Sequence, residues 1–208
     1  VRVWDLETGD CVRTLRAGRE VLRLALTPDD RRVIWTAGDP LGDAEVHVCD
    51  SAGRWDFETL GPSTLGITGL AVTADARRLV TASLDRTVKV WDLTTSEEVA
   101  CFIGEASIWG CAVNCDGTRI VAGDTNGNVY LLAVQNLVPG PAILTAWHSP
   151  VDGSYAFGCV LCREWSQVPE STLDTELPCP NCGKMVKLNQ FVIEADWRPI
   201  AKAWNGEE

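Results

Sequence analysis

A repeated five-residue pattern constrains the fold of this chain more than any other feature. The four copies are VRVWD (1–5), VHVCD (46–50), VKVWD (88–92) and VYLLA (129–133). Successive copies begin 45, 42 and 41 residues apart, and the last has lost both the Trp and the Asp. The first three copies begin with a basic residue or His between two Val residues, an alternation typical of a β-strand. Repeats of this length indicate an array of equivalent structural units.

A second motif recurs in phase with the first. Each unit carries an Asp between two stretches of apolar residues, and the three are Asp29, Asp75 and Asp116. An Asp side chain can accept a hydrogen bond from the backbone two residues on, which favours a turn. The residues before these turns are apolar enough for a buried inner strand. One unit is therefore predicted to contain four short strands.

The repeats resemble the WD-repeat family of β-propellers over about residues 1–147. The copy most similar to that family's motif spans residues 79–92. In the family a Ser or Thr, a turn Asp, a Trp and a His form a hydrogen-bonded tetrad, and the resemblance assigns Ser83, Asp85 and Trp91 to three of these places. The Gly-His pair expected before each inner strand is absent. We therefore expect incomplete tetrads.

The resemblance implies an all-β fold with about 3.5 blades of four-stranded antiparallel sheet. The predicted divisions are a half blade at 1–17 and blades at about 18–61, 62–104 and 105–147, the last ending with a strand at 142–147. Closed propellers have four to eight blades. The chain alone cannot close such a ring, and it lacks an initiator Met. We expect upstream blades to be missing from this sequence, and assembly with other copies is the alternative.

Two C-x-x-C pairs follow the repeats and predict a metal centre. They are Cys159 with Cys162 and Cys179 with Cys182, and sixteen residues separate the pairs. Two residues between thiols allow both to bind one ion, and two such pairs complete a tetrahedron. The segment resembles a zinc ribbon. We expect one structural Zn²⁺, because four thiolates leave no open position for a catalytic water.

The expected C-terminal domain is too small to bury an adequate core. It consists of a linker at 148–154 and a zinc ribbon at 155–208, whose apolar end (191–204) is predicted to pack the ribbon onto the last blade. A docking surface for a partner is the alternative for that end. Metal binding should supply much of the folding free energy. Without zinc, residues 155–191 should be disordered.

The charge balance argues against nucleic acid as a general partner. The chain has 18 basic and 29 acidic residues, a net charge of −11, whereas phosphate binding needs clustered Lys and Arg. A zinc ribbon that binds nucleic acid through Lys184, Lys187 and Arg198 remains the alternative function. No apolar run approaches the roughly 18 residues of a membrane span, and the first residues do not show the charged-then-apolar pattern of a leader. We expect a cytoplasmic protein with reduced thiols.

The sequence shows no constellation of catalytic residues. The two histidines are His47, expected to point outward from its strand, and His148, expected to pack at the domain junction. No phosphate-binding glycine motif occurs. The five blade cysteines are interpreted as small core residues: Cys11, Cys49, Cys101, Cys111 and Cys115. We predict that the protein is not an enzyme.

The predicted function is a protein-protein interaction scaffold or sensor module of a larger signalling protein. The arrangement of blades before a zinc ribbon resembles the carboxyl end of large bacterial signalling proteins, where WD-repeat domains follow a nucleotide-hydrolysing switch domain. That resemblance implies a propeller that senses a ligand and restrains the switch. The loop at 38–43 is the first candidate contact surface.

Overall fold

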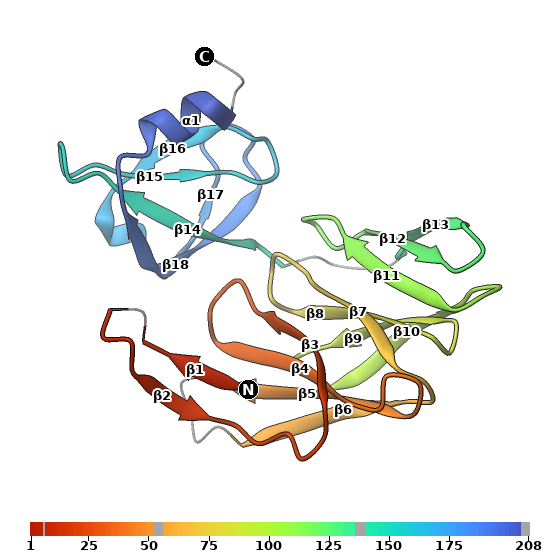
Figure 1. The fold of residues 1–208 in the computed structure, drawn as a ribbon. Coiled ribbons are helices and arrows are strands. Elements are labelled where there is room, and N and C mark those ends of the chain that lie inside the picture. The colour runs from red at the N-terminus through yellow and green to blue at the C-terminus, as the bar shows by residue number, and fades with distance from the viewer. Residues whose placement is uncertain (6, 52–55, 136–139, 205–208) are drawn as a thin grey trace.

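The regular secondary structure of the described residues is almost all β-strand, as the repeats predict. The computed structural model describes residues 1–5, 7–51, 56–135 and 140–204. Over these ranges the strands form five sheets, with one short 3₁₀-helix and one α-helix near the C-terminus (Figure 1). None of the helices in the described ranges has the length and hydropathy needed to cross a membrane.

The repeat region forms four antiparallel sheets. The first sheet pairs β1 (Arg2–Trp4) with β2 (Cys11–Thr14). The second sheet holds β3 (Val21–Leu26), β4 (Arg32–Gly38), β5 (Ala44–Asp50) and β6 (Phe57–Ser63), and the third holds β7 (Ile67–Val72), β8 (Arg78–Ser83), β9 (Thr87–Asp92) and β10 (Glu97–Ile103). The fourth sheet holds β11 (Ile108–Val113), β12 (Arg119–Asp124) and β13 (Val129–Ala133).

The first strands of the second, third and fourth sheets lie next to one another: β3 contacts β7, and β7 contacts β11. This is the radial arrangement of propeller blades.

The predicted Asp turns are confirmed in three sheets. Asp29 Oδ1 accepts a hydrogen bond from Arg31 N at 3.1 Å, and the corresponding bond from Arg77 N to Asp75 is 3.0 Å. Asp116 accepts from Thr118 N, also at 3.0 Å. These turns join the first and second strands of their sheets. The local sequence therefore encodes the hairpins directly.

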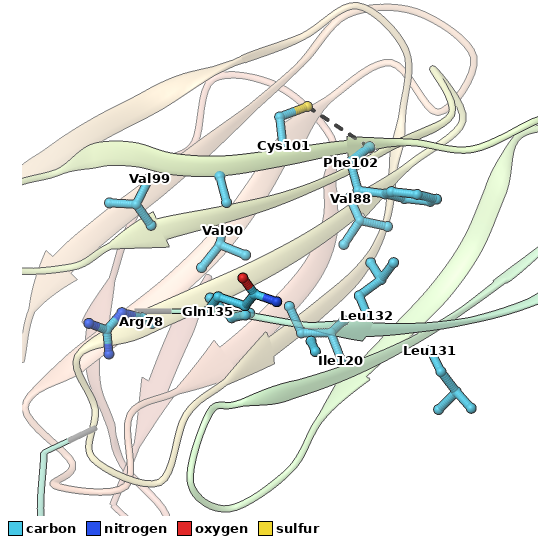
Figure 2. A pocket seen from close by; sticks show the side chains of 13 residues that line it. Arg78, Val88, Val90, Val99, Cys101, Phe102, Ile120, Leu131, Leu132 and Gln135 are labelled. Carbon is cyan, nitrogen blue, oxygen red and sulfur yellow. Dashed lines mark hydrogen bonds between the residues drawn. The ribbon is translucent and has the colours of Figure 1, made fainter. Parts of the chain in front are cut away.

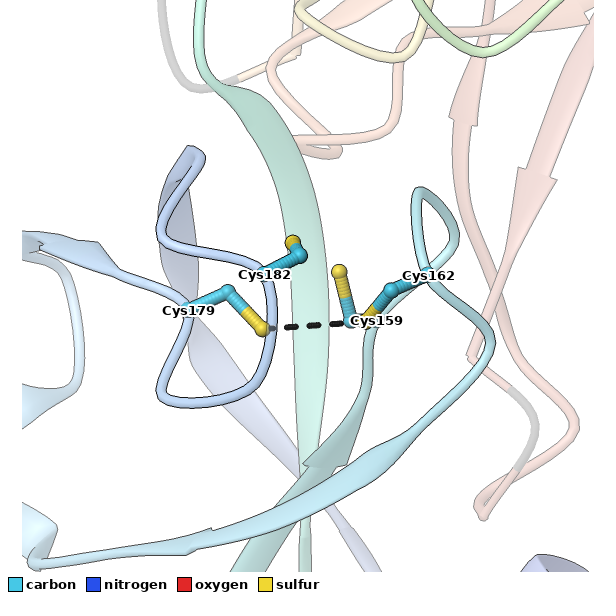
Figure 3. A group of neighbouring side chains, drawn as sticks. All are labelled: Cys159, Cys162, Cys179 and Cys182. Atoms are coloured by element: carbon cyan, nitrogen blue, oxygen red, sulfur yellow. Dashed lines mark hydrogen bonds between the residues drawn. The ribbon is translucent and has the colours of Figure 1, made fainter.

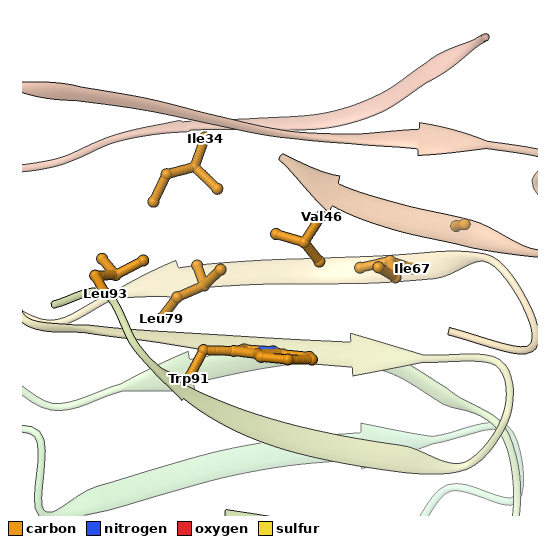
Figure 4. Packing of buried hydrophobic residues seen from close by; sticks show 7 residues of the cluster. Ile34, Val46, Ile67, Leu79, Trp91 and Leu93 are labelled. Atoms are coloured by element: carbon orange, nitrogen blue, oxygen red, sulfur yellow. The ribbon is translucent and has the colours of Figure 1, made fainter. Parts of the chain in front are cut away.

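Apolar side chains fill the spaces between neighbouring sheets. Leu79 and Trp91, which are 0% and 4% exposed, pack with Ile34, Val46 and Ile67 between the second and third sheets (Figure 4). The next residues along β8 and β9 point to the opposite face and pack against the fourth sheet, in a cluster of Val80, Ala82, Val88, Val90, Ile108, Ile120 and Ala122. The two central strands of the third sheet, β8 and β9, thus bury apolar side chains on both faces.

The C-terminal part forms a five-stranded sheet with the order β16-β15-β14-β18-β17. Its elements are β14 (Ala142–His148), β15 (Tyr155–Gly158), β16 (Trp165–Val168), the 3₁₀-helix η1 (Glu170–Thr172), β17 (Glu176–Pro178), β18 (Met185–Glu194) and α1 (Arg198–Trp204). Strand β14 pairs parallel with β18 and antiparallel with β15. We call this part of the chain the cysteine unit.

The position of β14 corrects the predicted blade boundary. Residues 142–147 were expected to be the fourth strand of the last blade, and residues 148–154 a linker, but β14 is the central strand of the cysteine unit. This place buries Ala142, Leu144 and Ala146 and pairs both edges of the strand. Beside β13, only one edge would be paired. In the described residues the last blade therefore has three strands.

The apolar C-terminal end packs within the cysteine unit. The prediction that it packs onto the last blade is wrong. Trp197 stacks on Trp165 of β16 at 5.8 Å between ring centroids, and Trp204 meets the same ring edge-on at 6.1 Å. Hydrogen bonds to the turn between β7 and β8 join this end of the chain to the blades. Ile143 N donates to Ala74 O at 2.7 Å, and Gly140 N donates to Asp75 Oδ2, also at 2.7 Å.

Candidate metal centre

Each pair of cysteines lies in the same kind of tight turn. The first turn follows β15, where Cys159 N donates to Glu164 O at 2.9 Å and Arg163 N donates to Cys159 O at 2.7 Å. The second turn follows β17 and repeats the two hydrogen bonds around Cys179, at 2.9 and 2.8 Å. These bonds bend the backbone so that both thiols of a pair point to one side. The two turns then face each other across the sheet (Figure 3).

The residue after each pair has a left-handed backbone conformation. Gly183 has a φ of +70°, as expected from its place after the last cysteine, and Arg163 has a φ of +64° in the first turn. Glycine adopts this region without steric cost, whereas a side chain with a Cβ does not. The two turns are therefore matched in geometry but not in local conformational energy.

The structure brings the four predicted ligands into one cluster. The sulfur atoms of Cys159, Cys162, Cys179 and Cys182 lie within 4.8 Å of one another, and the Cys162 and Cys179 sulfurs are 3.9 Å apart (Figure 3). A tetrahedral zinc ion with bonds of about 2.3 Å places its sulfur ligands about 3.8 Å apart. The donor set and its spacing therefore fit a single ion.

The surroundings of the thiols shift their pKa values in different directions. Burial raises the pKa of the Cys159 thiol to about 12. Burial also acts to raise the pKa of Cys179, but the N–H groups of Cys182 and Asn181 outweigh it, so the pKa of this thiol is lowered. Metal ligation requires thiolates. An ion bound here would displace protons, and its affinity would rise with pH.

The ligands are also part of the core of the cysteine unit. Cys159 and Cys179, 0% and 1% exposed, pack with Leu144, Phe157 and Val186. Strands on both sides of the cluster are thus anchored by the side chains that would bind the ion. An ion bound here would therefore act on side chains that are also part of this core.

The residues assigned to the blade tetrad are only partly brought together. Asp85 N donates to Ser83 Oγ at 3.1 Å, but the indole of Trp91 donates to Thr81 Oγ1 at 3.0 Å. At the end of β6, in the region where the resemblance places the His, Ser63 Oγ lies 2.7 Å from Ser83 Oγ and donates to Asp85 Oδ2 at 2.8 Å. Sequence reasoning missed Thr81 and Ser63. The alternation along β8 puts residues 81 and 83 on one face, which is the signal that could have found Thr81.

His47 was predicted to point outward from its strand, but it is buried. It is 4% exposed, and its ring lies 5.4 Å from Trp35 and 4.9 Å from Phe57. Its Nδ1 lies 3.0 Å from Thr59 Oγ1, and burial lowers the pKa of the imidazole. The buried Trp35 and the half-exposed Phe57 thus flank an imidazole that was expected to be solvated. His148 stacks on Tyr155 inside the cysteine unit.

The blade cysteines are less uniform than expected. Cys49 is buried and Cys111 is partly buried, and burial raises the pKa of Cys111 to about 12. The other three, Cys11, Cys101 and Cys115, are exposed, so their interpretation as core residues was wrong.

The fold and the cluster define a partial β-propeller followed by a four-cysteine unit. A family model described as the TEP-1 C-terminal β-propeller matches residues 65–133, the part of the chain that forms β7 to β13. The propeller domain of Cps50 (Swd1) from Myceliophteria thermophila has a similar structure, with a TM-score of 0.52 and 15% identity, over 71% of this chain and 50% of that one. At this identity the likeness shows the fold alone.

Curated relatives are similar over the same region. The target of rapamycin complex subunit wat1 of Schizosaccharomyces pombe is 32% identical over 94 residues, covering 45% of this chain and 29% of that protein. A guanine nucleotide-binding protein subunit beta-like protein of Encephalitozoon cuniculi is 24% identical over 159 residues, covering 65% and 47%. The chain thus spans less than half the length of either relative. Together the comparisons support WD-repeat propeller blades in this chain.

Proposed function

We propose that this chain is a non-enzymatic interaction scaffold or sensor module of a larger cytoplasmic signalling protein. Its blades would present a rigid surface to partner proteins, and its cysteine unit would be a zinc ribbon with one structural Zn²⁺. The proposal rests most directly on one observation, the convergence of four thiols from two matched turns beside a set of propeller blades.

The chemistry of the centre supports a structural role for the metal. Four cysteines supply a complete tetrahedral set, so no position is left for water or substrate. Cys thiolates favour Zn²⁺ over Mg²⁺ or Ca²⁺, which prefer oxygen ligands. The ligands would hold β15, β17 and β18 together and supply no reactive group.

The similar proteins support the interaction role. Two of them are named as subunits of the target of rapamycin complex, including LST8 of Saccharomyces cerevisiae, which is 29% identical over 102 residues, 45% of this chain and 30% of that protein. These names describe complex subunits and carry over to this chain only as a proposal.

The loop between β4 and β5 supports a contact surface on the blades. Asp39 N donates to Asp43 O at 3.0 Å, and Arg19 binds the carboxylate of Asp43 through two hydrogen bonds of 2.8 and 2.9 Å. Leu41 lies within this loop and is 78% exposed. A braced loop that exposes an apolar side chain loses little entropy on binding a partner.

The alternative, nucleic-acid binding through the ribbon, is disfavoured by the neighbours of its basic residues. Lys187 Nζ lies 3.5 Å from Asp174, and Arg198 forms ion pairs with Asp152 and Asp196. The hydrogen bond from Thr118 lowers the pKa of Asp116, and the charge of Lys184 contributes to this shift. Acidic partners therefore offset the small basic edge that phosphate would need.

Metal content and partner capture test the two parts of this proposal. Native mass spectrometry should find one zinc per chain, and a chain without stoichiometric zinc would reject the metal assignment. Immobilised protein should capture a defined partner that Leu41→Asp loses and Val151→Asp keeps, since Val151 is a similarly exposed residue (75%) on the cysteine unit. Equal capture by the two variants would reject the loop as the contact, and failure of every variant to capture a protein would reject the interaction role.

A further inference from the structure

The last blade has an open outer edge. In the second and third sheets, a fourth strand pairs antiparallel with the third, β6 with β5 and β10 with β9. Among the described residues no strand pairs with the outer edge of β13. Val134 N donates to Thr118 O, and Asp124 N donates to Asn128 O. Every second residue of β13 between these two bonds therefore directs its N–H and C=O groups toward β12. The backbone groups of Val129, Leu131 and Ala133 therefore point away from β12.

A groove of about 610 Å³ runs beside this edge, between the third and fourth sheets (Figure 2). Apolar side chains from β9, β10, β12 and β13 line most of it: Val88, Val90, Val99, Phe102, Ile120 and Leu132. Leu131, also at the groove, is 77% exposed. A groove of this size and lining is typical of a binding site, and the free strand edge supplies hydrogen-bonding groups along it.

A guanidinium group with one unsatisfied nitrogen lies at one end of the groove; its charge also acts on Asp92, the residue opposite it in β9. Arg78 contributes to the lining, and its Nη1 atom is buried with no hydrogen-bond partner in the described part of the chain (Figure 2). A buried donor left without a partner is costly, more so on a charged group. An acidic group entering the groove would satisfy it.

The outer strand of the neighbouring sheet has the chemistry that fits this groove. Strand β10 begins with Glu97 and Glu98, and apolar residues follow. Glu98 pairs with Lys89 of the adjacent strand at 2.9 Å. The acidic residues thus stand at the start of an outer strand, with a basic residue of the sheet beside them.

We propose that the groove binds an extended segment of a partner protein, which adds to β13 as an antiparallel fourth strand. This segment carries an acidic residue near its N-terminal end, opposite Arg78, and then apolar residues at alternate positions. The direction follows from the sheet, because β13 ends near Gln135, which lines the groove together with Arg78, and an antiparallel strand begins there. The inference rests on the proposed interaction role and names one surface and the kind of segment it takes.

A synthetic peptide tests this assignment directly. The probe is a fluorescein-labelled copy of residues 97–103 with Ser in place of Cys101 (EEVASFI), titrated with the full zinc-loaded chain and followed by fluorescence anisotropy. We expect saturable binding. Leu131→Pro should weaken it at least tenfold, because proline removes an N–H of the free edge and is tolerated on edge strands. Leu131→Thr keeps the N–H and should bind within about twofold of the unchanged chain.

Two further measurements keep the test independent of folding. A peptide methylated on alternate backbone nitrogens should lose binding to the unchanged protein, whether or not Leu131→Pro folds. A peptide with Gln for both Glu residues should bind the unchanged chain several-fold more weakly, but should equal the acidic peptide on Arg78→Gln.

Several results would overturn the assignment. They are equal binding by Leu131→Pro and Leu131→Thr, no loss on methylation, no coupling between the acidic residues and Arg78, or a stable dimer whose second copy occupies the β13 edge. If the peptide fails while Leu41-dependent partner capture persists, the groove assignment alone is wrong. If capture fails as well, the proposed function is wrong.

Discussion

The blades and the cysteine unit bury side chains for different reasons. In the third sheet, alternating residues such as Leu79 and Val80 pack against two neighbouring sheets, so burial comes from the repeat itself. In the cysteine unit, two of the seven residues in the buried cluster are Cys159 and Cys179, the proposed ligands. The core of the blades is therefore built from the apolar positions of the repeat, whereas the core of the cysteine unit includes the side chains proposed to bind the ion.

The connection between the two regions sharpens this contrast. Strand β14 directly follows the last blade in the chain but lies at the centre of the cysteine sheet. The proposed ion would stabilise β14 although this strand contributes no ligand to it. Loss of the ion should then affect residues from 142 onward, further toward the blades than the predicted limit of 155.

The largest expected effect comes from removing one ligand. Cys179→Ser should abolish zinc binding and unfold the cysteine unit, because a structural zinc supplies on the order of 10 kcal/mol to a small domain. Chemical denaturation should then show the blade transition alone. Cys101→Ser, at an exposed thiol of β10, is the matched control and should retain both zinc and stability. Loss of the blade transition in Cys179→Ser would mean that the two regions fold as one.

The converse change acts on the blades. Leu79→Ala should lower the free energy of unfolding of the blades by about 2–5 kcal/mol, since this side chain is 0% exposed between two sheets. Zinc content should stay at one per chain by native mass spectrometry. Leu41→Ala, at a 78% exposed position, should change stability by less than about 0.5 kcal/mol. Zinc loss in Leu79→Ala would contradict the separation of the two regions.

A smaller effect is expected from the hydrogen bonds around Asp85, at the third sheet. Asp85→Asn should cost about 1–3 kcal/mol, because Ser63 and Thr87 donate to this carboxylate. Burial acts to raise the pKa of Asp85, but these hydrogen bonds outweigh it and lower the pKa. The stabilisation is therefore present above about pH 4 and lost as the pH falls through the lowered pKa. Urea unfolding from pH 7 to 3 should show a shallower decline in Asp85→Asn than in Asp10→Asn, an exposed control.

The buried His47 gives the second sheet a different pH dependence. Because burial lowers the pKa of His47, the neutral ring stabilises the fold above about pH 6.5, and this contribution is lost as the pH falls through the lower folded value. Stability measured at pH 7.5 and pH 5 should fall in the unchanged chain and fall less in His47→Gln. An equal fall in both would assign the pH dependence to other groups.

The smallest expected effect separates the two turns of the metal centre. Gly183→Ala should destabilise the cysteine unit by about 1 kcal/mol, because φ is +70° and nothing lies within 4 Å of the added Cβ, so the cost is conformational. Arg163→Gly should stabilise it by a similar amount, since φ is +64° there. Thermal unfolding of the zinc-loaded chain measures both. Changes of the same sign would contradict the proposed strain at Arg163.

Local patterns predicted the parts of the structure that depend on neighbours in sequence. The turns at Asp29, Asp75 and Asp116 form as expected, because each Asp bonds its own backbone. The spacing of the cysteines predicted their convergence for the same reason, since two residues between thiols fix a turn.

Long-range pairing could not be predicted in the same way. The apolar segment at 142–147 suits either sheet, and the choice of β18 over β13 depends on burial of both its edges. The partner of Trp91 depends on cross-strand register, in which Thr81 lies opposite Lys89 and Leu79 opposite Trp91. The position of His47 depends on Phe57, a residue of the next strand that covers it. None of these relations is visible in a short window of sequence.

Hydrogen exchange with and without a chelator tests the central claim most directly. In the zinc-loaded chain, β8 and β9 of the third blade, β14 and β18 should all be protected. After zinc removal, amides of residues 142–194 should exchange rapidly while those of residues 78–92 keep their protection. Unchanged protection of β14 and β18 in the zinc-free chain, or equal loss in both regions, would contradict an account in which one part folds through its repeats and the other around a metal ion.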